Sequence, residues 1–163
     1  ASCLIRVLDS SPAGTYLIIE NSAGMGSHIG SSFEELGELL KSVDHPNLKI
    51  CLDTEHCFAA GYNIASKSDL DRIMDNFDKK IGLDKLVAVH ANDAKVELGS
   101  GVDRHENIGA GFIGIAGFEN ILSHPAFRNI PLILEVPGFE NNGPDKENVE
   151  ILKAIRGKLG LGV

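Results

Sequence analysis

The chain has 163 residues, of which 43% are hydrophobic and 23% charged, and its formal net charge at pH 7 is −8. A chain of this length is long enough for one domain, or part of one, with a core that buries about two-thirds of the unfolded surface. Its apolar stretches are shorter than the ~20 residues that span a bilayer, and its acidic balance argues against a basic phosphate-binding surface.

Four short apolar runs predict the strands of a parallel sheet, because strands buried on both faces are continuous apolar segments. In chain order these runs cover residues 17–19, 50–52, 86–89 and 132–134. Each run is followed directly by a side chain that can bind a metal, namely Glu20, Asp53, His90 and Glu135. In a βα barrel the chemistry lies where the strands end, so we expect these side chains to meet at one rim.

Segments with helical periodicity lie between and after the strands. They cover approximately residues 33–40, 68–82, 118–124 and 145–160. Ser32 precedes Glu35 at capping-box spacing, which indicates the start of the first of them. Ser68 is the predicted start of the second, and Gly82 its end. Residues 4–8 are typical of the end of a helix that belongs to a preceding unit.

The order of strand and helix, repeated four times, predicts an α/β fold with parallel strands and right-handed crossovers. An eight-stranded TIM barrel needs about 250 residues, so we interpret residues 1–163 as one domain that supplies four βα units, a half-barrel. Half a barrel leaves two open sheet edges, which favours self-association or pairing with a missing amino-terminal half. A compact four-stranded α/β domain is the alternative.

Loops above the strand ends add further histidines and carboxylates. The segment that begins at Asp53 continues to His56, which places an imidazole three residues beyond a strand-end carboxylate. A later glycine-rich loop carries Asp103 and His105, which point to the same side in extended chain and can hold one ion while Arg104 points away. Mixed histidine and carboxylate ligation suits zinc, manganese or iron.

Five motifs, in order over nearly the whole chain, resemble the endonuclease IV family of apurinic/apyrimidinic (AP) endonucleases. They are LIIENSAG at 17–24, LDTEH at 52–56 with FAAGY at 58–62, VHANDAK at 89–95, VDRHENIG at 102–109 and PLILE at 131–135. The resemblance implies a TIM barrel with three zinc ions that acts in base excision DNA repair. This nuclease hydrolyses the DNA phosphodiester 5′ to an abasic site and leaves a 3′ hydroxyl.

The resemblance also implies two zinc sites within this chain. The second zinc ion of the family would be held by Glu20, which bridges to the first ion, and by Asp53, His90 and Glu135. The third would be held by His56, Asp103 and His105. The first ion depends on two further histidines from the amino-terminal half, which this chain lacks. Glu55 stands where many relatives carry cysteine. Because it lies between two ligands in the chain, we expect it to face solvent or a neighbouring side chain rather than a metal.

The predicted catalytic residues are Glu135, which would orient or deprotonate the attacking water, and Glu20, which would hold two ions. Predicted phosphate contacts of the substrate come from Arg104, Lys95 and Asn21, although an exposed arginine or lysine is commonly only a solvated surface residue. The implied partner is duplex DNA with an abasic site, whose missing base makes extrusion of the sugar inexpensive.

Two other functions remain open from the sequence. A sugar-isomerase-like barrel would use a similar strand-end metal site, but it has no evident need for the additional ligands of the third ion. The second open function is non-enzymatic: a half-barrel that binds metal or self-associates without catalysis. Asn92 and Asp93 are interpreted as supports for neighbouring groups, and the glycine-rich residues 109–114 as a flexible rim loop instead of a dinucleotide-binding motif.

The compartment is predicted from cysteines and from the start of the sequence. The three cysteines lack CxxC spacing, and an odd number argues against a disulfide framework. The first residues show no basic segment followed by a long apolar core, the pattern of a secretory signal. We therefore expect an intracellular protein of the cytoplasm or nucleus that is neither secreted nor membrane-bound.

Overall fold

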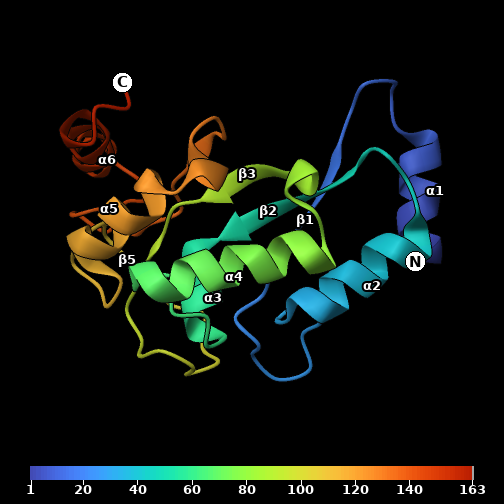
Figure 1. The fold of residues 1–163 in the computed structure, drawn as a ribbon, viewed down its shortest axis with the longest axis horizontal. Helices are drawn as coiled ribbons and strands as arrows, with labels where there is room; N and C mark the ends of the chain where they lie inside the picture. Colours follow the sequence, from blue (N-terminus) through green and yellow to red (C-terminus); the bar gives the residue numbers. More distant parts are fainter. Residues whose placement is uncertain (163) are drawn as a thin grey trace.

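A parallel four-stranded sheet organises the structure, a computed structural model that describes residues 1–162 (Figure 1). Its strands lie side by side in chain order: β1 (Leu17–Glu20), β2 (Leu48–Asp53), β3 (Leu86–His90) and β6 (Leu132–Ile133). Each neighbouring pair is parallel, which confirms the predicted arrangement. A short antiparallel pair, β4 (Asp93–Ala94) and β5 (His105–Glu106), follows β3 in the chain.

The main helices lie beside one another in chain order. They are α1 (Ser2–Ser10), α2 (Phe33–Val43), α4 (Lys67–Lys80), α5 (Gly114–Ser123) and α6 (Lys146–Lys158). Each contacts the next, so together they form a row (Figure 1). The short helix α3 (Thr54–Ala59) continues directly from β2, and the 3₁₀ turns η1 (Leu83–Lys85) and η2 (Pro125–Phe127) precede β3 and β6. Among the helices of residues 1–162, none has both the length and the apolar character needed to cross a membrane.

Local sequence explains where the helices begin. The Ser32 hydroxyl accepts the backbone N–H of Glu35 at 3.2 Å, and the Glu35 carboxylate accepts the N–H of Gly30 at 3.0 Å. This is the predicted capping box, except that the Glu35 side chain bonds to the N–H of Gly30, two residues before the N-cap residue Ser32. Helix α4 begins at Lys67, one residue before the predicted Ser68.

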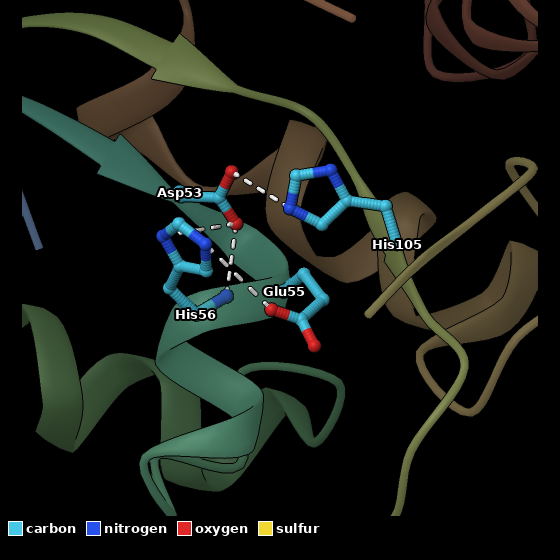
Figure 2. Close-up of side chains that lie close together, drawn as sticks. All are labelled: Asp53, Glu55, His56 and His105. Atoms are coloured by element: carbon cyan, nitrogen blue, oxygen red, sulfur yellow. Dashed lines mark hydrogen bonds and ion pairs between the residues drawn. The ribbon is translucent and has the colours of Figure 1, made fainter. Parts of the chain in front are cut away.

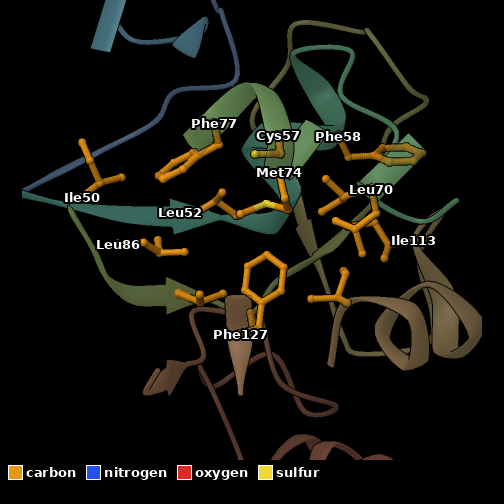
Figure 3. Packing of buried hydrophobic residues seen from close by; sticks show 14 of the residues in the cluster. Ile50, Leu52, Cys57, Phe58, Leu70, Met74, Phe77, Leu86, Ile113 and Phe127 are labelled. Carbon is orange, nitrogen blue, oxygen red and sulfur yellow. The ribbon is translucent and has the colours of Figure 1, made fainter. Parts of the chain in front are cut away.

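The two faces of the sheet differ in burial. On the face that packs against helices, Ile50, Leu52 and Val89 are at most 1% exposed, and Phe77 of α4 and Phe127 of η2 pack nearby (Figure 3). On the other face the edge strands are open: Ile18 of β1 is 43% exposed and Ile133 of β6 is 45% exposed. In a closed barrel this second face would line the interior, so the described sheet has the form of an open barrel segment.

Gly37 lies where α2 approaches α4. A Cβ atom at this position would lie 2.4 Å from the backbone carbonyl oxygen of Lys80, so Gly37→Ala must push the two helices apart. We expect this variant to lower the free energy of unfolding by about 1–3 kcal/mol in urea denaturation. The matched control is Gly157→Ala in α6, where a Cβ atom has no neighbour within 4 Å and alanine favours the helix. Equal stability of the two variants would contradict this packing.

Candidate metal centre

The register of the parallel strands brings the predicted strand-end side chains to one face of the sheet. Glu20 is paired with Cys51, and Asp53, two residues further along β2, is paired with His90. Neighbours in register point to the same side, and residues two apart in a strand share a face. Glu135 continues this pattern two residues beyond the end of β6. The four side chains therefore converge although they are up to 115 residues apart, from position 20 to position 135.

His90 lies at the centre of what we call the strand-end group. Its Nδ1 atom is 3.1 Å from Glu20 Oε1, 3.0 Å from Glu135 Oε2 and 3.8 Å from Asp53 Oδ2. One ligand atom from each of these four residues lies within 4.8 Å of the others. Three carboxylates this close together repel one another unless positive charge lies between them, so the group fits a divalent cation.

A second cluster is formed by α3 and the loop that enters β5 (Figure 2). Here Asp53, Glu55, His56 and His105 each offer one ligand atom within 4.8 Å of the others. Asp103 completes the cluster: its Oδ2 lies 3.3 Å from His56 Nε2, and its Oδ1 lies 3.5 Å from His105 Nε2. We call Glu55, His56, Asp103 and His105 the loop group.

Three buried atoms of the loop group have no hydrogen bond in the described part of the chain, and the two histidine nitrogens among them have only ion-pair contacts. Within residues 1–162, the buried side-chain atoms without a hydrogen bond are Glu55 Oε2, His56 Nε2 and His105 Nε2. Nearly all buried polar atoms in folded proteins are hydrogen-bonded, so three exceptions in one place need a common cause. A cation bound between them would interact with all three, and the residues present therefore fit a metal ion.

Hydrogen bonds and charges shift the pKa values of this centre. Burial opposes ionisation of Glu20, but its hydrogen bond with His56 and the charge of His90 outweigh burial and lower its pKa. Burial also opposes protonation of His56, yet the bond to Glu20 and the charge of Asp53 raise its pKa to about 10. At Asp53 and Glu55 burial dominates and raises both pKa values.

Zinc binding is expected to release a proton from His56. Its Nδ1 must donate to the Asn21 carbonyl oxygen, 2.9 Å away, because that oxygen can only accept, and this directs Nε2 toward the loop group. A histidine nitrogen must be unprotonated to bind a metal, and a pKa of about 10 keeps His56 protonated at pH 7. Zinc affinity should therefore rise with pH across the neutral range, where His56 is protonated in the metal-free protein. Calorimetric titration with Zn²⁺ in two buffers of different ionisation enthalpy measures the released protons. Identical heats in both buffers would contradict the prediction.

Two buried asparagines support the ligands. The Asn92 side chain donates to Asp53 Oδ2 at 2.6 Å and accepts the backbone N–H of Glu135 at 2.8 Å, as the predicted supporting role requires. The sequence predicts a phosphate contact for Asn21, but the structure places this side chain at 5% exposure beneath the centre. It accepts the backbone N–H of Asp53 at 2.7 Å and donates to its carbonyl oxygen at 3.2 Å. This geometry makes Asn21 a positioning residue for Asp53.

The other two predicted phosphate contacts, Arg104 and Lys95, are exposed. Their backbones pair across the β4–β5 hairpin, where the Lys95 N–H donates to the Arg104 carbonyl oxygen at 2.9 Å. The Arg104 side chain donates to the Asp103 carbonyl oxygen at 2.8 Å, and Lys95 Nζ lies 3.6 Å from Glu106 Oε2. Arg104 lies between two residues of the loop group in the chain, and Lys95 lies beside Arg104 across the hairpin. Contact of either cation with a substrate stays a prediction.

Glu55 is the residue whose place the sequence misses. It is 0% exposed, so the expectation that it faces solvent is wrong, and it faces neighbouring groups instead. Its Oε1 accepts the backbone N–H of Arg104 at 3.0 Å, and its Oε2 lies 4.0 Å from His56 Nε2. Glu55 follows a strand end in the first turn of α3, where the chain changes from a repeat of two residues to one of 3.6, and spacing alone does not predict its direction.

Comparison with known proteins gives a family and a set of relatives. Residues 4–155 match the family described as xylose isomerase-like TIM barrel. The protein named "Probable endonuclease 4" of Halothermothrix orenii is 45% identical over 141 residues, which are 86% of this chain and 51% of that protein. The "Apurinic-apyrimidinic endonuclease 1" of Plasmodium falciparum is 42% identical over 143 residues, 87% of this chain and 24% of that protein.

A solved structure agrees with these relatives. The crystal structure of endonuclease IV from Thermus thermophilus superposes with a TM-score of 0.77 at 34% sequence identity, covering 94% of this chain and 53% of that one. The chain thus spans about half the length of most of the relatives named here. The similarity extends over both the strand-end group and the loop group, since it includes nearly all of the described residues.

Proposed function

Since the chain belongs to the xylose isomerase-like TIM-barrel family, within its endonuclease IV group, we propose that it forms the carboxy-terminal half of a zinc-dependent AP endonuclease. The substrate of the whole enzyme would be duplex DNA with an abasic site. The reaction would be hydrolysis of the phosphodiester on the 5′ side of that site. The observation that carries this proposal is the convergence of two groups of histidine and carboxylate side chains on one face of the sheet.

The two groups would each hold one ion. Glu20, Asp53, His90 and Glu135 suit the second zinc ion of the family, and His56, Asp103 and His105 suit the third. Glu20 Oε1 lies 3.1 Å from both His56 Nδ1 and His90 Nδ1, so this carboxylate lies beside both groups. As the bridging ligand that the family resemblance implies, it would bind the first ion as well as the second. Bound zinc would supply positive charge for the phosphate oxygens and lower the pKa of water toward neutrality. The family's first ion requires two further histidines, which we expect from an amino-terminal half.

Glu135 is the residue we assign to the attacking water. Its side chain is 46% exposed, whereas that of Asp53 in the same group is 0% exposed. In a βα barrel the substrate and water reach the carboxyl ends of the strands, where Glu135 lies, so the exposed Glu135 carboxylate is better placed than the buried Asp53 carboxylate to accept a proton. Asn92 Oδ1 accepts the backbone N–H of Glu135 at 2.8 Å, which fixes the position of the backbone that carries this side chain.

The loop group favours a phosphodiester over a free sugar as substrate. A strand-end group alone would also serve a sugar-isomerase-like enzyme of this family. The additional ligands His56, Asp103 and His105 supply a second cation beside the first, which suits the several oxygens of a phosphodiester. The exposed cations Arg104 and Lys95 lie next to this group and suit contacts with neighbouring phosphates.

The proposal is tested with a duplex oligonucleotide that carries one tetrahydrofuran abasic analogue. The duplex is incubated with Zn²⁺ and this chain, with a separately prepared amino-terminal half of an endonuclease IV relative, and with both. Cleavage 5′ of the analogue with both halves, and none of an intact duplex, is the expected result. If the two halves associate and bind zinc but do not cleave, the nuclease function is wrong and a non-catalytic metal-binding role is favoured.

A further inference from the structure

Glu55 is a buried carboxyl group of the loop group, and hydrogen bonds within the described residues satisfy only one of its two oxygens. The whole residue is 0% exposed, and of its two carboxylate oxygens only Oε1 has a hydrogen bond, from the Arg104 backbone N–H. Within residues 1–162, Oε2 has no hydrogen-bond partner. A buried carboxylate is costly unless it is paired or coordinates a metal, so the position of Oε2 requires an explanation.

We propose that Glu55 is a direct ligand of the cation in the loop group, so that this site is formed by two carboxylates and two imidazoles. Glu55 and Asp103 would provide the oxygens, and His56 and His105 the nitrogens. The inference rests on the proposed metal centre, but it does not depend on DNA cleavage. It adds a ligand that the three-residue set His56, Asp103 and His105 does not include.

The separations of Glu55 and of Asp103 from His56 are those of ligands of one ion. Glu55 and His105 offer ligand atoms within 4.8 Å of each other. Two ligands that each lie about 2.1 Å from one ion are at most about 4.2 Å apart. Glu55 Oε2 is 4.0 Å from His56 Nε2, and His56 Nε2 is 3.3 Å from Asp103 Oδ2. The close-up shows Glu55 and His56 of α3 on one side and His105 on the other (Figure 2). All three unpartnered atoms of this cluster, Glu55 Oε2 among them, would gain a partner from the same ion.

Glu55 also connects the two segments that carry the other ligands. Its Oε1 holds the backbone N–H of Arg104, which lies between Asp103 and His105 in the chain. The same carboxylate would thus fix the loop through one oxygen and bind the ion through the other. The Asp103 side chain is 48% exposed and its charge is screened by water, whereas the buried charge of Glu55 acts at lower dielectric. We therefore expect Glu55 to contribute strongly to metal affinity.

The test compares zinc binding by Glu55→Gln with binding by the unmodified chain. Glutamine keeps the size of the side chain and an acceptor for the Arg104 N–H, but it removes the charge. We expect native mass spectrometry to show loss of one zinc ion per chain, and chelator competition to show affinity for that ion reduced about 10-fold or more. The visible spectrum of the Co²⁺-loaded protein should change as well, because it reports the ligands directly.

The matched control is Glu106→Gln, which makes the same change of charge in β5. Glu106 Oε1 already accepts the Asn107 N–H at 2.9 Å, and Oε2 faces Lys95. This variant should bind zinc like the unmodified chain. Circular dichroism of both variants verifies that they are folded.

Each result has a distinct meaning. Unchanged zinc affinity and an unchanged Co²⁺ spectrum in Glu55→Gln would overturn the role of Glu55 and leave the metal centre in place. Absence of bound metal in the unmodified chain would overturn both. If Glu55→Gln does not fold, the zinc position is determined instead from the anomalous signal in crystals of the zinc-loaded unmodified protein. A Glu55 oxygen within about 2.5 Å of the ion supports the proposal, and a separation beyond about 3.5 Å overturns it.

Discussion

Glu135→Gln is expected to lower strand cleavage by the complemented enzyme about 10²–10⁴-fold while leaving the fold intact. Glutamine has the same shape, and the backbone bond from Glu135 N–H to Asn92 Oδ1 is unaffected by the change. What the variant loses is the negative charge that would bind a cation and accept the proton of the attacking water. The assay is gel separation of the cleaved abasic duplex under single-turnover conditions, with circular dichroism to compare the folds.

The control for this variant is Glu140→Gln, an exposed glutamate that follows the same strand five residues later. It should cleave at the rate of the unmodified protein. Full activity in Glu135→Gln would remove Glu135 from the mechanism and move the role of base to another group, with the partly exposed Glu20 the next to examine.

The largest effect on stability is expected from Asp93→Ala. The Asp93 carboxylate is 0% exposed and accepts backbone N–H groups from five residues. These are Ala94, Gly109, Gly111, Ile113 and Gly114, at 2.8–3.3 Å. Alanine would leave these donors without an acceptor, and we expect the free energy of unfolding to fall by about 3–5 kcal/mol. Urea denaturation monitored by circular dichroism measures the loss.

A second variant separates the hydrogen bonds of Asp93 from its volume. Asp93→Asn keeps the shape and one acceptor oxygen, so it should lose less stability than Asp93→Ala. Amide hydrogen exchange should become faster in residues 109–114 of both variants, since these residues lose their common acceptor. If Asp93→Ala unfolds at the same urea concentration as the unmodified protein, the carboxylate does not anchor this segment.

Much of the fold follows from local patterns in the sequence. The four apolar runs became β1, β2, β3 and β6, because continuous apolar segments of this length are typical of parallel strands. The edge strands β1 and β6 are buried on one face only. The helix starts followed from capping residues such as Ser32. The strand-end group could be predicted for the same reason. Parallel strands place their carboxyl ends at one edge, so the residue after each apolar run is brought to the others without any knowledge of loops.

The sequence by itself thus determined the order of strands and helices and the convergence of Glu20, Asp53, His90 and Glu135. Only the tertiary structure decided the places of Glu55, Asn21 and the 109–114 segment. Glu55 is buried in the loop group. The side-chain amide of Asn21 both donates and accepts a hydrogen bond with the Asp53 backbone. The segment expected to be a flexible loop is held by hydrogen bonds to the Asp93 carboxylate. The physical reason is that turns have no fixed period. The direction of a side chain in a turn depends on contacts with residues that are distant in sequence. The spacing of residues in the sequence does not predict those contacts.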